Sequence, residues 1–242
     1  MANSLIIIPT YNEIQNISLI IKAVFEQAID CHLLIVDDNS PDGTSEAVEG
    51  IQLEYSGKLF LEKREGKQGL GTAYIHGFKW ALKREYEYIF EMDADFSHNP
   101  VDLVRMYNEA QKEDLDMVIG SRYITGVNVV NWPMSRVLLS YGASKYVRLI
   151  TGMPINDTTA GFVCYSRRLL EKINLNNIKF VGYAFQIEMK FKAYLLKCSY
   201  KEIPVIFTDR SKGESKMTKG IISEAIFGVI QMKLNSIFKN QS

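Results

Sequence analysis

Two acidic residues separated by a single alanine, Asp93 and Asp95, follow the apolar run Tyr88–Phe90. Carboxylates this close together repel each other, and they lose solvation at the end of a buried strand unless a positive group lies between them. A divalent cation meets that need, because Mg²⁺ and Mn²⁺ prefer carboxylate oxygens and bind phosphates at their open positions. An isolated pair of this kind also fits a surface loop in which both side chains face water, so its meaning depends on the rest of the chain.

Polar residues also follow two other apolar runs of strand length. Leu5–Pro9 leads into the polar segment Thr10–Glu13, and Cys31–Val36 leads into Asp37 and Asp38. Apolar strands that alternate with segments of helical periodicity predict an α/β fold, with a mixed, mostly parallel sheet flanked by helices. Ligands bind beyond the carboxyl ends of the strands in such sheets, so the three polar clusters are expected to meet at one edge.

The same periodicities predict the remaining elements. Further strands are expected at Lys58–Lys63, Glu87–Met92, Met117–Gly120, Phe162–Tyr165 and Glu202–Phe207. The last of these contains Pro204 and is therefore expected at an edge of the sheet. Helices are expected at Ile14–Ala28, Thr44–Leu53, Leu70–Leu82, Val101–Lys112, Pro133–Gly152, Tyr183–Leu196 and Thr218–Phe238. No internal repeat or linker interrupts the chain, which favours one domain over residues 1–216 and an amphipathic C-terminal helix over 217–242.

The composition of the 242-residue chain argues against several classes of protein. Hydrophobic residues make up 47% and charged residues 23%, as in ordinary globular domains. Lysine plus arginine and aspartate plus glutamate both number 28, so no overall field attracts nucleic acid and no such partner is expected. No stretch approaches the ~20 apolar residues of a membrane span, and the N-terminus lacks the pattern of a signal peptide. The three scattered cysteines indicate reduced thiols in the cytoplasm.

The glycine-rich segment Gly66–Gly71 fits neither of the common phosphate-binding loops. Gly69 and Gly71 are not followed by the third glycine of the dinucleotide fingerprint, and the segment does not follow the first strand. Thr72 follows Gly71 directly, without the lysine of a Walker loop. Acidic strand ends combined with basic residues later in the chain instead indicate a diphosphate bridged by a metal ion. The basic candidates are Arg122, Arg210, Lys212 and Lys216, although a single Lys or Arg is more often a solvated surface charge.

Seven segments, in order along nearly the whole chain, resemble the polyprenol-phosphate (dolichol-phosphate) mannosyltransferases of glycosyltransferase family 2. These segments are Pro9–Glu13, Val36–Thr44, Arg64 with Gly66–Tyr74, Asp93–Pro100, Gly120–Tyr123, Gly182–Glu188 and Arg210–Lys216. The resemblance implies a GT-A (nucleotide-diphospho-sugar transferase) fold, with the catalytic domain over residues 1–216. The chain departs from the family pattern at Asp157–Val163, where a basic residue is usual and Val163 stands instead.

The resemblance also implies roles for individual residues. Those expected to line the nucleotide pocket are Pro9, Tyr11, Glu13, Val36, Asp38 and Ala94. Asp93 and Asp95 are expected to hold Mg²⁺ or Mn²⁺ against the donor diphosphate. Those expected to bind the diphosphate and the acceptor phosphate are Arg122, Arg210 and Lys216, and those expected near the donor sugar or acceptor are Gln186 and Glu188.

The implied reaction is a metal-dependent, inverting transfer of mannose from GDP-mannose to dolichyl or polyprenyl phosphate, which gives a β-linked product. A phosphate monoester is largely ionised at pH 7, since its second pKa is near ~6, and it needs no strong general base. His76 and His98 are accordingly expected on a helix face and in a loop and not as catalysts. Two alternatives stay open: a family 2 transferase that uses UDP-glucose or another sugar nucleotide, and a non-catalytic nucleotide-sugar binding subunit. The Q-x-x-R-W motif of polysaccharide synthases is absent.

A lipid acceptor would bring the protein to a membrane surface, so we expect a cytoplasmic protein that is peripheral on the cytoplasmic face of a membrane. The predicted helix Thr218–Phe238 has an apolar stripe with lysines around it, and it could lie in the membrane interface. Packing against the core or a partner helix is the more common role of such a stripe. A membrane-anchoring partner and a homo-oligomer both remain open.

Overall fold

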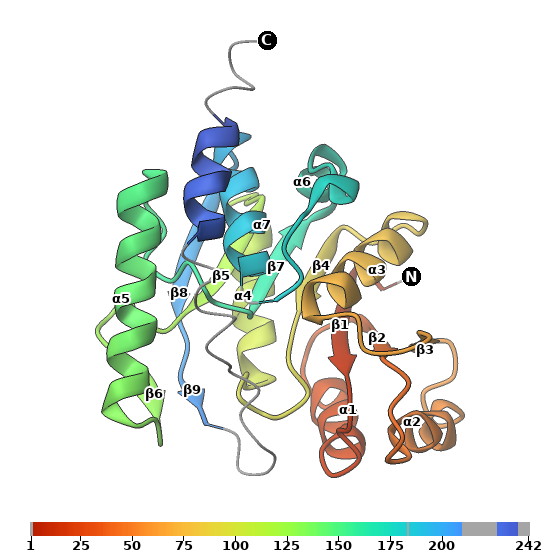
Figure 1. The fold of residues 1–242 in the computed structure, drawn as a ribbon. Coiled ribbons are helices and arrows are strands. Elements are labelled where there is room, and N and C mark those ends of the chain that lie inside the picture. Colours follow the sequence, from red (N-terminus) through yellow and green to blue (C-terminus); the bar gives the residue numbers. More distant parts are fainter. Residues whose placement is uncertain (1, 183, 210–226, 237–242) are drawn as a thin grey trace.

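The central element is a sheet with strand order β3-β2-β1-β4-β7-β5-β8 (Figure 1). The computed structural model describes residues 2–182, 184–209 and 227–236. The strands of the sheet are β1 (Ser4–Thr10), β2 (Cys31–Asp37), β3 (Leu59–Lys63), β4 (Tyr88–Glu91), β5 (Met117–Ser121), β7 (Val163–Ser166) and β8 (Tyr200–Pro204). All neighbouring pairs are parallel except those of β7, which runs antiparallel to β4 and β5. The sheet is therefore mixed and mostly parallel, as predicted.

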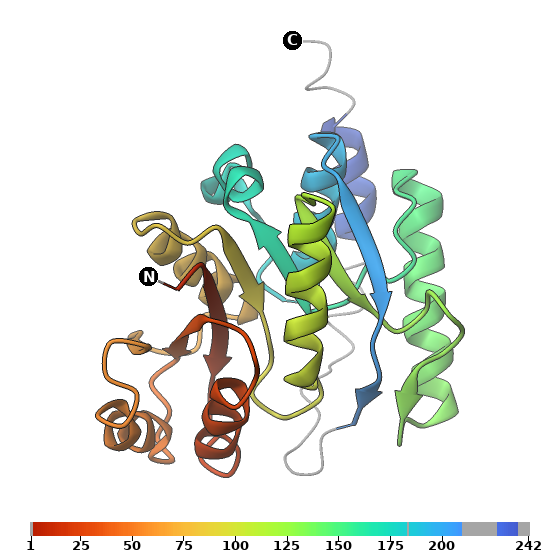
Figure 2. The same ribbon diagram turned by 180° about the vertical axis from the view of Figure 1, so that it is seen from behind.

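Helices cover both faces of this sheet. They are α1 (Ile17–Phe25), α2 (Thr44–Gln52), α3 (Leu70–Leu82), α4 (Val101–Lys112), α5 (Met134–Thr151), α6 (Arg167–Lys172) and α7 (Ala184–Leu195), with a 3₁₀ turn at Leu175–Asn177. The face seen in Figure 1 carries α3 and α7, and the face seen in Figure 2 carries α1 and α4. Successive residues of β1 enter opposite cores, Ile7 beneath α3 and Ile8 beneath α1, because side chains alternate along a strand. Both faces are buried, which explains why the strand is apolar throughout.

Two local predictions need correction, and two short elements were not predicted. The first helix begins at Ile17 and not at Ile14, because the amides of Asn16 and Ile17 both bond to the carbonyl of Glu13 in a preceding turn. The predicted strand Glu202–Phe207 is divided between β8, which lies at the sheet edge as its proline indicated, and β9 (Phe207–Thr208). Strand β9 pairs with β6 (Val129–Val130) in a separate two-stranded sheet, and neither β6 nor α6 was predicted.

Residues 227–236 form a helix that packs on the core through Val229 and Met232. Phe227, Ile230 and Leu234 of the same helix are exposed. The other residues of the predicted C-terminal helix lie outside the described part of the chain. Within the described ranges, no helix is both long enough and apolar enough to cross a bilayer. Cys31 and Cys164 are buried and Cys198 is half-buried, and none of the three is paired with another.

The two halves of the chain meet where α3 contacts α7. The amide of Gly71 donates to the carbonyl of Val181 at 2.8 Å, and the ring of Tyr74 stacks on that of Phe185 with centroids 6.0 Å apart. A side chain at position 71 would collide with Phe185, since a Cβ there would lie 2.7 Å from the ring atom Cγ. Glycine therefore permits the close approach of these two helices.

Candidate functional site

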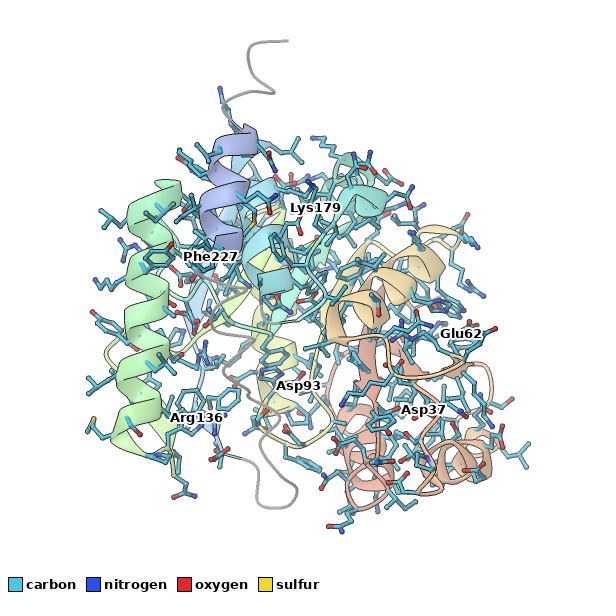
Figure 3. All side chains as sticks on the ribbon, in the orientation of Figure 1. Asp37, Glu62, Asp93, Arg136, Lys179 and Phe227 are labelled. Carbon is cyan, nitrogen blue, oxygen red and sulfur yellow. The ribbon has the colours of Figure 1, made fainter. Side chains whose placement is uncertain are left out.

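The carboxyl ends of β2, β1 and β4 lie side by side at one edge of the sheet. Thr10 at the end of β1 is paired in register with Asp37 at the end of β2, and Ile7 is paired with Glu91 at the end of β4. Figure 3 shows Asp37 and Asp93 at this edge, with Arg136 on the far side of Asp93. The topology thus brings the three polar clusters of the sequence to the same part of the molecule, where ligands bind in parallel α/β sheets.

Asp37 organises the turn after β2. Its buried carboxylate accepts hydrogen bonds from the hydroxyls of Thr10, Ser40 and Ser45 at 2.6–2.8 Å, and from the amide of Ser40 at 2.9 Å. All these donors saturate a carboxylate that would otherwise be costly to bury. Asp37 is therefore a structural residue that fixes the position of its neighbour, Asp38.

Asp38 is buried beside Arg64, which the sequence indicated only as part of a family motif. The Nε and Nη2 atoms of Arg64 lie 2.6 and 2.5 Å from Oδ1 of Asp38. Nη1 of Arg64 donates to the hydroxyl of Thr72 at 2.8 Å, at the start of α3. Arg64 thus links the predicted nucleotide residue to the glycine-rich segment. Both of its contacts with Asp38 use a single carboxylate oxygen.

The other predicted nucleotide residues have different environments. Pro9 near the end of β1 is partly exposed, as are Tyr11 and Glu13 just after the strand. Nζ of Lys67 lies 4.8 Å from the centre of the Tyr11 ring. Val36 is fully buried and its side chain belongs to the core. Ala94 is also buried, between the two half-exposed aspartates.

The loop after β4 presents Asp93 and Asp95 with the help of His98. The amide of Asp93 donates to Nδ1 of His98 at 3.1 Å, and the amide of Ser97 donates to Oδ1 of Asp95 at 3.0 Å. His98 is buried and stacks on Phe162, with ring centroids 4.8 Å apart. Burial lowers the pKa of His98, which favours the neutral imidazole that this hydrogen bond requires. His98 therefore shapes the loop, which is where the sequence predicted it to lie.

The two aspartates suit a metal ion that the donor helps to bind. Among the described residues, no group of three or more His, Cys, Asp or Glu side chains could hold an ion by itself. Mg²⁺ in phosphate-binding sites needs only one or two protein carboxylates, because substrate phosphates and water complete its octahedron. The half-exposed carboxylates of Asp93 and Asp95 supply oxygen ligands of this kind and fit such an ion.

Arg122 lies at the end of β5 and is held by a residue that the sequence did not single out, Asp157. Its Nε and Nη2 atoms donate to the two carboxylate oxygens of Asp157 at 2.7 and 2.6 Å, and Nη2 also donates to Thr159 at 2.8 Å. Burial raises the pKa of Asp157, but the charge and hydrogen bonds of Arg122 outweigh burial and hold that pKa below its usual range. The pair forms a rigid, buried cation in which two guanidinium nitrogens are already engaged.

Aromatic rings connect this arginine to a second one. The guanidinium carbons of Arg122 and Arg136 lie 5.5 and 4.0 Å from the ring centre of Trp132, and Phe207 lies 5.6 Å from Arg122. Arg136 is paired with Asp209 at 2.8 Å. The sequence placed Arg136 on a helix without a role, and its position three residues after Pro133 gave no further signal. Arg210 and Lys216, also predicted to bind phosphate, lie outside the described residues.

Gln186 and Glu188, predicted near the sugar or acceptor, are both buried on α7. The carboxylate of Glu188 accepts from the amides of Lys179 and Phe180 at 2.8 and 3.0 Å and thereby anchors the segment before α7. Gln186 bonds to Glu91, and its neighbour on the helix is the fully buried Lys190. Burial raises the pKa of Glu91 to about 8 and lowers that of Lys190 to about 8. Sequence reasoning missed both of these ionisable residues, because each lies among apolar residues just outside a family segment.

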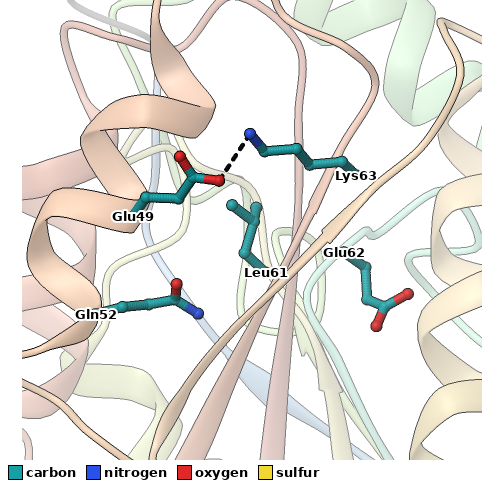
Figure 4. A pocket seen from close by; sticks show the side chains of 5 residues that line it. All are labelled: Glu49, Gln52, Leu61, Glu62 and Lys63. Carbon is teal, nitrogen blue, oxygen red and sulfur yellow. Dashed lines mark ion pairs between the residues drawn. The ribbon is translucent and has the colours of Figure 1, made fainter.

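A separate hollow lies on the edge strand β3 and on α2, shown in Figure 4. Its lining residues are Glu49, Gln52, Leu61, Glu62 and Lys63. Lys63 and Glu49 pair across it at 2.8 Å, with about half of each side chain exposed. None of the predicted site residues lines this hollow, whose charged residues are two glutamates and one lysine.

Comparison with known proteins defines the class to which this fold and site belong. Residues 5–174 match the model of the family "Glycosyl transferase family 2", and the chain belongs to that family. It is 43% identical over 228 residues, which are 94% of this chain and 86% of the relative, to the polyprenol monophosphomannose synthase of Mycolicibacterium smegmatis. It is 41% identical to the undecaprenyl-phosphate mannosyltransferase of Micrococcus luteus, over 95% of this chain and 93% of the relative. The resemblance seen in the sequence is thereby confirmed.

Solved structures agree with the predicted fold. Glucosyl-3-phosphoglycerate synthase from Mycobacterium tuberculosis, in complex with Mn²⁺, UDP and its product, superposes with a TM-score of 0.66 at 15% identity. The match covers 97% of this chain and 79% of the synthase. The GT-A fold is confirmed.

Proposed function

We propose that this protein transfers mannose from GDP-mannose to a polyprenyl phosphate and forms a β-linked lipid-phosphate sugar. The observation that carries the proposal is the placement of the carboxylates of Asp93 and Asp95, which follow β4, and of a buried cation, Arg122, which follows β5, close to the same buried residue, His98. The names of the two relatives support polyprenyl phosphate as the acceptor and mannose as the sugar.

The donor side of the site would be formed by the ends of β1 and β2 and by the loop after β4. Arg64 occupies Oδ1 of Asp38, which leaves Oδ2 as the oxygen that could accept a hydroxyl or amino group of the nucleotide. Asp93 and Asp95 would hold Mg²⁺ or Mn²⁺ against the diphosphate, where the ion neutralises charge on the departing nucleotide. The Mn²⁺ in the structurally similar synthase is compatible with this choice of ion.

The acceptor side requires positive charge and no strong base. A phosphate monoester attacks as an ionised oxygen, so no residue has to remove a proton from it. Arg122 is fixed before the substrate arrives, so little reorganisation accompanies charge development in the transition state. We assign Arg210 and Lys216, which lie beyond the described residues, to the same phosphates. Direct displacement by the acceptor inverts the anomeric centre and gives the β product.

The test is a transfer assay with purified protein and radiolabelled donors. GDP-mannose, UDP-glucose and UDP-N-acetylglucosamine are each offered with undecaprenyl phosphate and with dolichyl phosphate, and the anomeric configuration of the product is read by NMR. Transfer of mannose with β configuration is expected. Transfer only from UDP-sugars would reject the mannosyl assignment, an α-linked product would reject direct displacement, and no transfer from any donor would favour a binding subunit.

We further propose that the protein works at a membrane surface on the cytoplasmic side, since its acceptor is a lipid. Helix 227–236 could contribute to contact with the membrane, because Phe227, Ile230 and Leu234 are exposed while Val229 and Met232 face the core. Replacement of the three exposed residues by serine should weaken flotation with liposomes while the melting temperature stays within a few degrees. Unchanged flotation would assign the helix to packing alone.

A further inference from the structure

A layer of buried polar groups lies between α7 and the sheet, beneath the candidate site. Glu91 comes from the end of β4, and Gln186 and Lys190 come from adjacent turns of α7, which place them on the same face of the helix. Glu91 and Lys190 are 0% exposed and Gln186 is 3% exposed. None of the three can therefore touch a substrate in this conformation, although the first lies two residues before Asp93.

The hydrogen bonds of this layer run in one direction. Nζ of Lys190 donates to Oε1 of Gln186 at 3.2 Å and to the carbonyl of Ala160 at 2.6 Å. Nε2 of Gln186 donates to Oε2 of Glu91 at 2.9 Å. An ammonium group has only donors, so it requires the oxygen of the glutamine amide, and the amide nitrogen must then point at the carboxylate. Lys190 thus fixes the orientation of Gln186.

The two ends of the layer reach opposite sides of the site. Glu91 ends β4, whose continuation carries Asp93 and Asp95. Ala160 lies in the loop that also carries Asp157, whose carboxylate accepts hydrogen bonds from Nε and Nη2 of Arg122. We call this pair the Arg122 clamp. Lys190 therefore joins the segment that carries Asp93 and Asp95 to the loop that carries the Arg122 clamp.

Stability alone is a poor explanation for this arrangement. Burial of an amine and a carboxyl group is costly, either as ions or through the pKa shifts that neutralise them, and apolar residues of similar volume are often as stable or more so. The layer is also incompletely satisfied, since Oε1 of Glu91 has no hydrogen-bond partner among the described residues. Leucine or methionine at these positions would fill the same space without either cost.

We propose that Lys190 is a positioning residue that sets the spacing between the carboxylates of Asp93 and Asp95 and the Arg122 clamp, through Gln186 on one side and Ala160 on the other. The inference rests on the proposed function for its effect on transfer. Without the ammonium group, the end of β4 and the Asp157 loop would no longer share a common anchor. A misplacement of about 1 Å costs on the order of 10²-fold in rate.

The test compares Lys190→Met with Gln186→Leu. The first variant removes the hydrogen bonds of Lys190 to both Gln186 and Ala160. Its kcat should fall by on the order of 10²-fold, and its KM for undecaprenyl phosphate should rise several-fold. The second variant removes only the link to Glu91 through the Gln186 amide, and Lys190 keeps its hydrogen bond to Ala160. Its kcat should fall while the KM for the acceptor stays within about twofold. Binding of Mn²⁺ in the presence of GDP, measured by calorimetry without turnover, should weaken in both variants.

A matched control separates positioning from loss of stability. Met189→Ala creates a cavity one residue away on the same helix and leaves the polar layer intact. It should lower the melting temperature at least as much as Lys190→Met, with Mn²⁺ binding and acceptor KM unchanged. If the three variants share one pattern, or if Lys190→Met only lowers the melting temperature, the positioning role is overturned and the proposed function survives. If the wild type transfers no sugar, the Mn²⁺ measurement still tests the link from Lys190 through Gln186 to Glu91.

Discussion

The two sides of the site are built by different means. On the donor side, Asp37 accepts hydrogen bonds from residues three and eight positions later and from Thr10 on the neighbouring strand. On the acceptor side, Arg122 pairs with a residue 35 positions away, and in the polar layer between the two sides Gln186 bonds to a residue 95 positions away. Hydrogen bonds in the turn after β2 position the residues of the first side, whereas the packing of elements that are distant in the sequence positions those of the second.

This difference changes what each side costs and how it can fail. The donor side relies on hydroxyls and amides that form local turns around Asp37, and these can form as soon as the strand is paired. It also holds one buried ion pair, Asp38 with Arg64. The acceptor side holds the buried pair of Arg122 with Asp157, and each charge depends on its partner to remain buried. Loss of Arg122 or Asp157 should therefore be far more costly than loss of a hydroxyl that donates to Asp37.

The largest effect is expected for Arg122→Met, which leaves the fully buried carboxylate of Asp157 without its counter-ion. Removal of one member of a buried pair costs about 3–5 kcal/mol of unfolding free energy. Urea denaturation should show this loss. Arg168→Met is the matched control, because Arg168 pairs with Asp114 and Asp116 at the surface, where such pairs contribute about 0–1 kcal/mol. Equal losses in the two variants would contradict the contrast between the sides.

Asp95→Ala tests the donor side through catalysis. Removal of a preorganised group that stabilises developing charge costs about 10²–10³-fold in rate, equivalent to about 3–4 kcal/mol. The folded state should change little, because Asp95 is half-buried and the hydrogen bond that its carboxylate accepts from the Ser97 amide lies within a loop. The assay is sugar transfer with and without EDTA, with Asp114→Ala as a surface carboxylate control. Full activity of Asp95→Ala in EDTA would reject the metal site.

The strands of the first half could be predicted because their physics is local. Leu5–Pro9 and Cys31–Val36 are apolar on both faces and end at polar turns, and the observed strands β1 and β2 differ from them by one residue at each changed end. The short pair β6 and β9 could not be predicted, because two-residue strands have no periodicity and depend on where Asn128 and Asp209 bring the chain together. The start of α1 was missed because Ile14 continues the helical spacing while lying in a turn.

The site could be predicted only where the residue type itself carries the chemistry. Asp93 and Asp95 stand out because two carboxylates one residue apart need an explanation, and Arg122 follows a strand. Asp157 and Lys190 carry no such signal. An aspartate before two threonines indicates a turn, and a lysine among apolar helical residues indicates a side chain that extends to solvent. Only the packing of α7 and the Asp157 loop against the sheet shows that both are interior charges.

The contact between the two halves offers a smaller effect. Gly71→Ala would place a methyl group 2.7 Å from Cγ of Phe185 and force α3 and α7 apart, at a cost of about 1–3 kcal/mol. Gly50→Ala in α2 is the control, because a Cβ there meets no atom within 4 Å and should stabilise the helix by about 0.5–1 kcal/mol. Thermal unfolding of both variants checks the opposite signs. A neutral Gly71→Ala would show that the halves tolerate separation.

The smallest effect, and the one that separates the sides most directly, is a change in acid sensitivity. The pKa of Asp157 in the folded protein is held below its ordinary value of 3.8, so its stabilising contribution is fully present above that pH and is lost as the pH falls further. Asp157→Asn should therefore be less stable than the wild type at neutral pH, and the difference in unfolding free energy should narrow below pH 3.8. In the Arg122→Met background the guanidinium no longer lowers this pKa, although the main-chain amide of residue 122 still donates to the carboxylate. Burial, the largest influence on the carboxylate, raises the pKa. Asp157→Asn should then cost nothing or even stabilise the protein at neutral pH, because it removes an unpaired buried charge. Urea denaturation of the four proteins at several pH values measures these differences, and a penalty for Asp157→Asn that is the same in both backgrounds would show that Arg122 does not hold the carboxylate.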